Sequence, residues 1–353
     1  MTQILDGKKL AEKILKKLQK RVENMAKKGI NPFLVVISVG RDKASQIYLA
    51  AKKKACQEVG IPFEILNLKE DIQTAQLLRA IEKFNLDPKI SSVLVQLPLP
   101  EQINLTIVAK KISPEKDVDG FGYIIGKKNF KFLPPTPLGI LRILKEYLIS
   151  LKDKKIVIIG KGFLVGKPLG KLLKKTGAKV VFCDRETKDL KQKTLASDIL
   201  ICATGRANII RADMVKSGVV VIDAGALLAE VDFQAVSKKA RAITPVPGGV
   251  GPMTVAMLLE NVVLASQKSK GKTTMQNSKV YDLKKRAFLF SLAVIKFLEM
   301  LPKDYISQVI GRQLLRSVTS IGANIIEAQS ASSKKDFANF YNTALKSANE
   351  SKY

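Results

Sequence analysis

The chain has 353 residues, enough for two or three domains with separate cores, and its 46% hydrophobic content with mixed charges is typical of a globular protein. The N-terminus lacks an apolar h-region and no run of about 18 apolar residues occurs, which argues against a secretory leader and a membrane span. The chain has no histidine and three widely spaced cysteines, so we expect a reduced, cytoplasmic protein with no metal site. The net charge of +29 is spread over the whole chain, which favours attraction of anionic small molecules over nucleic-acid binding.

Helical and strand patterns alternate over the first hundred residues. Apolar residues recur at helical spacing in three segments, and two short apolar runs are rich in β-branched residues. Such alternation is typical of a layered α/β domain. The expected elements are helices near 7–28, 44–59 and 74–85 and strands at 33–40 and 91–97.

A second run of alternation follows the proline-rich segment LPPTP at 133–137. Its four strands are short, apolar and separated by helical patterns, which predicts a parallel sheet covered on both faces. These strands carry the sequences KIVIIG, KVVFCD, DILICAT and VVVIDAG.

The segment 266–279 is polar, small and basic, without a hydrophobic period, and we interpret it as a linker. After it the strand patterns end, and three long amphipathic helices are expected over 280–353. The predicted fold class is therefore α/β, with a Rossmann-like parallel-sheet domain, followed by an all-α helical tail.

The stretch IVIIGKGFLVGKP (156–168) places glycines at 160, 162 and 166, in the spacing G-x-G-x-x-x-G. It reads as a strand, a glycine turn and a helix that starts near Pro168, where proline suits a first turn. Glycines allow a tight turn, and the helix N-terminus offers free N–H groups to a pyrophosphate. The stretch therefore predicts a dinucleotide-binding loop that is one residue longer than the usual motif.

The charges near this loop do not agree on one cofactor. Asp184 ends the next strand, where an acidic residue would bind a ribose 2′-hydroxyl and favour NAD. Arg185 and Lys161 could each hold the 2′-phosphate of NADP. The choice between NAD and NADP stays open at this point.

Without histidine, acid–base chemistry must use Lys, Tyr, Asp or Glu. Tyr48 and Lys52 are four residues apart and share one edge of a predicted helix, and a desolvated lysine has a lowered pKa. On spacing alone, a half-buried tyrosine beside a lysine with its amine in solvent is the favoured interpretation. Two segments are unusually constrained: VQLPLP (95–100), with the polar Gln96 in an apolar strand, and PVPGGVGPMT (245–254).

Several motifs together resemble the bifunctional methylenetetrahydrofolate dehydrogenase/methenyltetrahydrofolate cyclohydrolase family. They are YLAAKKKA, VQLPLP, PEKDVDGF, PPTPLGI, the glycine loop and ITPVPGGVGPMTVAMLLEN, in the family's order, and the resemblance covers residues 1–268. It implies a two-lobed folate domain, a nucleotide domain and a homodimer formed through the nucleotide domain. The expected boundaries are 1–138 for the folate domain, completed by a helix at 252–267, then 139–251 for NAD(P) binding, 268–280 for the linker and 281–353 for a partial helical bundle.

The resemblance also implies roles for particular residues, and it reverses the interpretation of Lys52 from spacing alone. Lys52 matches the catalytic lysine, Tyr48 the tyrosine that stacks on the pteridine, and Gln96 the glutamine that binds the lysine. Asp119 matches the carboxylate that holds the pteridine. The implied substrate contacts are Tyr48, Lys52, Gln96, Leu97, Asp119, Pro247, Gly248 and Gly249, and the implied cofactor contacts are Gly160, Lys161, Gly162, Gly166, Arg185 and Ala226.

The implied activity is NAD(P)-dependent oxidation of 5,10-methylenetetrahydrofolate to the methenyl cation, followed by hydrolysis to 10-formyltetrahydrofolate. NADP is the expected cofactor, with NAD as the alternative. Because DAGALL (223–228) and Asp184–Arg185 depart from the family pattern, a cyclohydrolase with weakened dehydrogenase activity is a second hypothesis. A basic nucleic-acid-binding scaffold that acts through the tail is a third.

Residues 280–353 resemble the four-helix-bundle proteins encoded in ribosomal RNA intervening sequences, through VYDLKKRA, QLLRSVTSIGANIIEA and SKKDFANFYNTALKSANE. Arg316, Ser320, Asn324 and Glu327 form a polar stripe, which we interpret as a hydrogen-bonded helix contact rather than a catalytic site. The resemblance covers three of the four helices and so predicts an open apolar face for self-association or docking.

Overall fold

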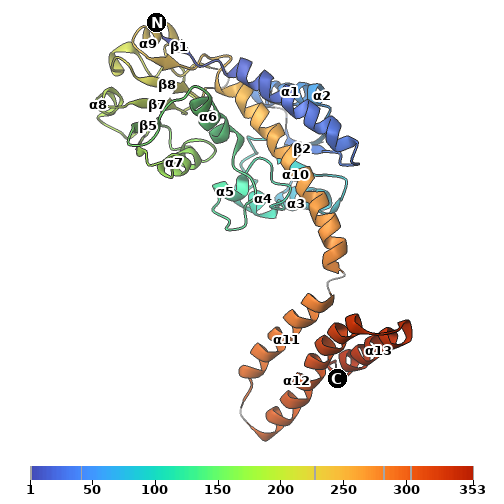
Figure 1. Cartoon of the computed structure of the whole chain (residues 1–353). Helices are drawn as coiled ribbons and strands as arrows, with labels where there is room; N and C mark the ends of the chain where they lie inside the picture. Colours follow the sequence, from blue (N-terminus) through green and yellow to red (C-terminus); the bar gives the residue numbers. More distant parts are fainter. Residues whose placement is uncertain (1, 41, 226–227, 281–282, 303, 353) are drawn as a thin grey trace. The chain divides into compact units, whose positions relative to one another are not determined.

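The computed structural model describes residues 2–352 except 41, 226–227, 281–282 and 303, and it leaves out the side chains of residues 43–44, 268–280 and 284–286. The chain forms two compact units, Met1–Ser269 and Lys270–Tyr353. Figure 1 shows the elements of both. The first unit contains two parallel sheets, each in its own lobe, and the second is helical.

The first lobe holds a three-stranded parallel sheet in the order β3-β2-β4. All residues of β2 and β4 are buried, as their continuous apolar sequences predict. The third strand was not predicted, because FEILNL is an edge strand that carries polar residues and is only partly buried. The strands are β2 (Leu34–Val39), β3 (Phe63–Leu68) and β4 (Ser92–Val95).

Helices of the first lobe follow their apolar stripes. In α1, Leu10, Ile14 and Leu18 are buried at four-residue spacing, and the Asp6 side chain caps the helix by accepting a hydrogen bond from Lys9 N. The three predicted helices are confirmed to within two residues, whereas two short ones, α4 and α5, were missed. The helices are α1 (Gly7–Ala26), α2 (Lys43–Val59), α3 (Thr74–Leu86), α4 (Leu105–Lys111) and α5 (Phe121–Ile124).

The second lobe holds a six-stranded parallel sheet in the order β1-β9-β8-β7-β5-β6. The four predicted strands are confirmed, and β1 and β9 extend the sheet, so the chain begins in the second lobe. Since β6 and β7 lie on opposite sides of β5, the strand order reverses there and leaves a crevice at the carboxyl ends of β5 and β7. The strands are β1 (Gln3–Ile4), β5 (Lys155–Ile159), β6 (Lys179–Cys183), β7 (Ile199–Cys202), β8 (Val220–Asp223) and β9 (Ala242–Ile243).

Short helices connect these strands. The predicted boundary at 138/139 lies inside α6, which begins with the proline-rich segment. The helix predicted to start near Pro168 begins two residues earlier, at Gly166, and Pro168 lies within its first turn as expected. The helical segments are α6 (Pro135–Glu146), α7 (Gly166–Lys174), α8 (Leu190–Leu195), the 3-10 turn η1 (Ala212–Met214) and α9 (Phe233–Ser237).

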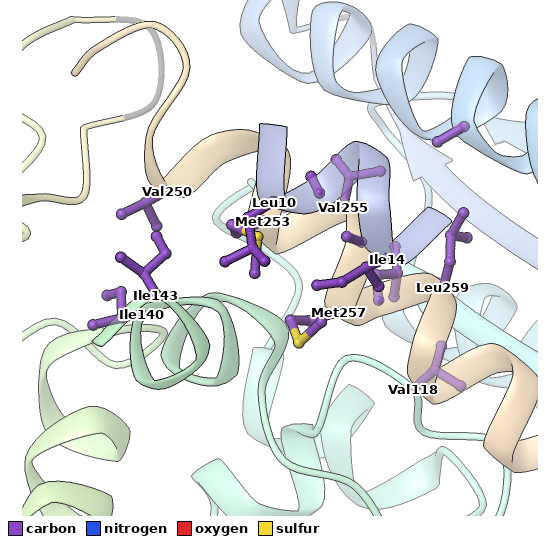
Figure 2. Close-up of a cluster of buried hydrophobic side chains, with 14 of the residues drawn as sticks. Leu10, Ile14, Val118, Ile140, Ile143, Val250, Met253, Val255, Met257 and Leu259 are labelled. Carbon is purple, nitrogen blue, oxygen red and sulfur yellow. The ribbon is translucent and has the colours of Figure 1, made fainter. Parts of the chain in front are cut away.

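The long helix α10 (Val250–Val280) joins the two lobes through a shared core. In Figure 2 its apolar side chains lie among those of α1 and α6, with Met253 and Met257 between Leu10, Ile14 and Ile143. The segment 250–267 is long and apolar enough to cross a membrane, with a mean hydropathy of 1.2. Because 61% of it is buried among these side chains, we assign its apolar residues to the core.

The structure corrects the backbone expected for the linker. Segment 268–280 continues α10 as helix instead of an irregular connection, because it contains no proline and only one glycine. The division between the two compact units falls at Ser269/Lys270, inside this segment.

Among the described residues after α10, the second unit has three long helices, as predicted. Their core cluster is small and consists of Ala287, Ile321, Ile325 and Ala344. In the polar stripe, Ser320 Oγ lies 2.9 Å from Ser347 Oγ and Asn324 Nδ2 donates to Ser320 O, whereas Arg316 and Glu327 are exposed. The helices are α11 (Leu283–Glu299), α12 (Tyr305–Glu327) and α13 (Lys334–Glu350), with the 3-10 turn η2 (Ala328–Ser330).

Candidate active site

A lysine and a glutamine meet at the carboxyl end of the smaller sheet. Lys52, on α2, is only 9% exposed, and its Nζ donates a 2.8 Å hydrogen bond to Gln96 Oε1. Gln96 directly follows β4; its backbone N donates to Ile37 O of β2, and its Nε2 donates to Leu97 O. The Gln96 carboxamide is therefore fixed by a hydrogen bond at each end, with its oxygen toward the Lys52 amine and its nitrogen toward Leu97 O.

Both lobes line the cavity that contains this pair, which has a volume of about 310 Å³. A neighbouring cavity of about 570 Å³ shares Tyr48, Leu97 and Leu164 with it. The two cavities together can hold an elongated ligand that reaches Lys52 with one of its ends. The first cavity is lined by Tyr48, Lys52, Gln96, Leu97 and Asp119 of the first lobe, Val250, Gly251 and Thr254 of α10, and Leu164, Val165 and Ala224 of the second lobe.

Burial shifts the protonation of Lys52 and Asp119 in opposite directions. Desolvation lowers the pKa of the Lys52 amine, and the charge of Asp119 offsets part of that effect. Desolvation likewise raises the pKa of the Asp119 carboxyl, and Lys52 offsets part of it. A lysine in this environment exchanges a proton at a lower pH than an exposed one.

The Tyr48 hydroxyl lies one helical turn before Lys52 and is buried without a hydrogen-bond partner among the described residues. Burial also raises the pKa of this phenol. An unpaired buried hydroxyl costs about 1–3 kcal/mol. This cost would be recovered by a ligand that presents a polar atom at the cavity wall.

The DVDG loop is held in place by contacts on both sides of Asp119. Asp117 accepts hydrogen bonds from Phe121 N (3.0 Å) and Gly122 N (2.6 Å), and burial raises the pKa of its carboxyl to about 6. Asn261 of α10 donates to Val118 O at 2.8 Å. Asp117 and Asn261 were missed as positioning residues, although an asparagine on the apolar face of a predicted helix could have indicated a buried polar contact.

The glycine-rich loop before α10 contributes to the first cavity differently from the expectation. The lining contains Val250 and Gly251 but not Pro247, Gly248 or Gly249. Gly248 O instead accepts a hydrogen bond from Lys8 N of α1. A Cβ on Gly7 would lie 1.9 Å from Gly249 O, so this loop packs directly against the start of α1. The substrate contacts of these three residues stay a prediction.

A separate cavity of about 370 Å³ lies in the crevice of the larger sheet. Gly160 has φ +102°, and a Cβ there would lie 2.2 Å from Ala203 O. A Cβ on Gly166 would lie 1.9 Å from Gly160 O, whereas one on Gly162 would meet nothing within 4 Å. Gly160 and Gly166 thus allow close packing of the backbone, and the absence of a side chain at Gly162 leaves room for a bound pyrophosphate.

The charged residues of this cavity include a pair that the sequence could not reveal. Lys161 Nζ lies 2.5 Å from Asp184 Oδ2, and this hydrogen bond lowers the pKa of the Asp184 carboxyl. Arg185 also lines the cavity, as does Arg206, which was not predicted. The predicted contact Ala226 lies outside the described residues.

A glycine-loop cavity at the reversal of strand order in one sheet, and a buried lysine at the end of another, define a two-lobed α/β enzyme of the dinucleotide-dependent class. A family model of the tetrahydrofolate dehydrogenase/cyclohydrolase catalytic domain matches residues 5–119, and one of the NAD(P)-binding domain matches residues 134–270. The chain belongs to the tetrahydrofolate dehydrogenase/cyclohydrolase family. Residues 279–353 match the model of the 23S rRNA-intervening sequence protein.

Individual relatives agree with this assignment. The bifunctional protein FolD of Nautilia profundicola is 48% identical over 275 residues, which cover 75% of this chain and 97% of that protein. The crystal structure of the bifunctional enzyme FolD from Campylobacter jejuni has a TM-score of 0.72 at 44% identity, covering 76% of this chain and 99% of that one. The Trypanosoma brucei enzyme, complexed with NADP cofactor and an inhibitor, has a TM-score of 0.72 at 32% identity and covers 76% and 98% of the two chains.

Proposed function

We propose that the protein oxidises 5,10-methylenetetrahydrofolate with NADP⁺ and hydrolyses the methenyl product to 10-formyltetrahydrofolate. The observation that carries this proposal is the buried Lys52 amine on Gln96, in a cavity lined by both lobes. The alternatives of a cyclohydrolase with a weakened dehydrogenase and of a nucleic-acid scaffold are not favoured, because both enzyme domains match over most of the chain.

Four residues of the first cavity have a proposed task. Asp119 holds the pteridine by hydrogen bonds, and Tyr48 stacks on it and gains a partner for its hydroxyl. The neutral Lys52 amine accepts a proton from the water that attacks the methenyl carbon, then passes one to the ring nitrogen that leaves, while the second proton goes to solvent. Gln96 keeps the amine oriented through its oxygen.

The cofactor cavity fits a dinucleotide by its backbone. Gly160 and Gly162 would border the pyrophosphate at the start of α7, and Lys161 and Arg185 would lie at the ribose 2′-phosphate. When bound, the nicotinamide accepts the hydride that leaves the folate methylene. Ala224 lines the first cavity, which supports a nicotinamide site on that side of the second lobe.

Asp184 is expected to limit the preference for NADP, because its carboxylate forms an ion pair with Lys161 and so competes with the 2′-phosphate for this lysine. Asp184→Asn should free this lysine and raise the ratio of kcat/KM for NADP⁺ over NAD⁺ by about tenfold, the effect of one exposed charge contact at a phosphate. The measurement is NADPH or NADH formation from methylenetetrahydrofolate by the purified full-length protein. Asp213→Asn, which removes another exposed carboxylate paired with a lysine, is the control. An equal shift in both variants would contradict a specific role for Asp184.

The family resemblance supports a homodimer formed through the nucleotide lobe and a cytoplasmic location, and we propose both. The helical tail carries a further surface. Large apolar side chains of α11 and the first half of α12 are exposed, and we name them the tail patch: Phe288, Leu289, Phe290, Leu292, Ile295, Phe297, Met300, Tyr305, Ile306, Val309 and Ile310.

We propose that a second copy of the tail covers the tail patch. A large aromatic side chain has an area of about 150–250 Å², and each patch residue is 37–82% exposed. The patch therefore exposes on the order of 1,000 Å², against about 800 Å² per partner in a stable interface. Residues 288–310 carry two basic and two acidic residues, so their formal charges balance and oppose neither self-association nor close packing of two copies.

Substitutions in the tail patch should therefore change the assembly state. Ile306 and Ile310 are 69% and 60% exposed, so changing both to Glu should leave the fold intact and reduce a larger assembly to the enzyme dimer. Light scattering on the full-length protein measures this. Leu345→Glu, at 60% exposure on α13, is the matched control. A wild-type protein that is strictly dimeric at tens of micromolar would refute the proposal.

A further inference from the structure

Glu230 is a carboxylate that the proposed reaction does not use, and it is only 1% exposed. Its oxygens accept hydrogen bonds from Thr204 N (2.7 and 3.0 Å), from Thr204 Oγ (2.8 Å) and from Gly205 N (2.8 Å). A buried carboxylate is costly unless it is hydrogen-bonded, and here the donors belong to a single turn. The carboxylate thus holds the turn that follows β7.

That turn forms one wall of the cofactor cavity. Thr204 and Arg206 line the cavity, and Arg206 N donates to Thr204 Oγ at 3.1 Å. Ala203, which directly precedes the turn, packs against the glycine loop: its carbonyl oxygen fills the space that a Cβ on Gly160 would need. A shift of the turn would therefore displace both the wall and the glycine loop.

A second buried carboxylate holds Glu230 itself. Asp223 accepts hydrogen bonds from Glu230 N (2.8 Å), Val231 N (3.0 Å) and Gly225 N (2.8 Å). Gly225 follows Ala224, which lines the catalytic cavity. The two carboxylates thus connect the backbone at one cavity with the turn at the other.

We propose that Glu230 is a positioning residue for the nicotinamide cofactor, which acts by holding the Thr204–Gly205 turn in the shape that accepts the dinucleotide. This inference rests on the proposed function, since it assumes that the cavity of the larger sheet binds NADP. It assigns Glu230 no contact with the cofactor. A change at Glu230 is expected to affect the dehydrogenase activity and not the cyclohydrolase activity, because the cyclohydrolase step uses Lys52 and needs no hydride acceptor.

The test compares Glu230→Gln and Glu230→Asp in the full-length protein. The amide of Glu230→Gln supplies one oxygen where two accept now, so some N–H groups of the turn lose their acceptor. We expect a 10- to 100-fold rise in the Kd for NADP⁺ by calorimetry, which corresponds to about 1.4–2.7 kcal/mol. The KM for NADP⁺ should rise equally, and cyclohydrolase kcat/KM should stay within about twofold. Glu230→Asp keeps the charge and should recover part of the affinity.

Asp198→Asn is the matched control, because Asp198 accepts a hydrogen bond from Lys155 N at the other end of the sheet from Thr204. Its Kd for NADP⁺ should change by less than about twofold. The inference is overturned if Glu230→Gln binds NADP⁺ like the wild type, if both activities fall in parallel with no recovery in Glu230→Asp, or if the wild type does not bind NADP⁺. A wild type that binds NADP⁺ but lacks turnover would refute the proposed function alone, and the change in Kd would still decide the role of Glu230.

Discussion

Replacing Lys52 with methionine is expected to reduce the cyclohydrolase kcat by about 100- to 10,000-fold, the usual contribution of a positioned acid–base group. Methionine keeps most of the buried volume and removes the amine that donates to Gln96. Oxidation of methylenetetrahydrofolate needs no proton transfer through this amine, so NADPH formation should persist. Parallel assays of NADPH formation and of methenyltetrahydrofolate loss on one preparation measure both activities.

The pH dependence provides a second readout of the same lysine. Because burial lowers the pKa of Lys52, the neutral amine is populated below lysine's ordinary value of 10.5, and cyclohydrolase kcat/KM should increase with pH through that lowered pKa. Lys53→Met, at an exposed position on the same helix, should leave both activities within about twofold. Unchanged hydrolysis in Lys52→Met would refute the catalytic role.

Replacing Gly160 with alanine is expected to lower dehydrogenase kcat/KM at least 100-fold, with hydrolysis largely retained. The glycine has φ +102°, which costs an L residue about 1–2 kcal/mol, and the added Cβ would lie 2.2 Å from Ala203 O. Since that neighbour is backbone, the cofactor turn must move, and a loss of about 2.7 kcal/mol in cofactor binding corresponds to 100-fold. Steady-state kinetics with NADP⁺ and calorimetric binding measure the loss.

Gly218→Ala separates backbone strain from displacement of the turn. Gly218 also has a positive φ (+79°), but a Cβ there would meet nothing within 4 Å. This variant should lose some thermal stability and keep both activities. If the two glycine variants lost dehydrogenase activity equally, the close approach of Gly160 to Ala203 would not be what shapes the cofactor site.

Much of the fold could be predicted from periodicity. Apolar residues at helical spacing predicted the helix near 7–28, whose Leu10, Ile14 and Leu18 are buried in α1, and continuous apolar runs predicted the buried strands. The strand β3 could not be found this way, because its residues are only partly buried at a sheet edge and its pattern is mixed. The helix over 268–280 was missed because polar residues without a period are compatible with both helix and linker.

The site residues were harder to assign, because spacing places side chains on one face without giving their environment. Four-residue spacing puts Tyr48 and Lys52 on one helix edge, and on spacing alone the Lys52 amine is expected in solvent; the family motifs are what indicate a buried amine. Burial of Lys52 depends on β4, whose end carries Gln96, and on Asp119 from a third segment. Glu230 and Asn261 had no sequence motif of their own.

The alternation of helices and strands, the glycine loop, the family and the helical tail can be predicted from the printed residues, because each depends on residues that are close along the chain. Which charges are desolvated and which are paired follows instead from the packing of distant segments. Lys52 is buried next to Gln96 and Asp119, which come from two other segments. Lys161 is paired with Asp184 at the ends of two adjacent strands, and Glu230 holds a turn 25 residues earlier in the chain. The free energy of a charge depends on its surroundings in space, and these surroundings form only when distant segments pack together.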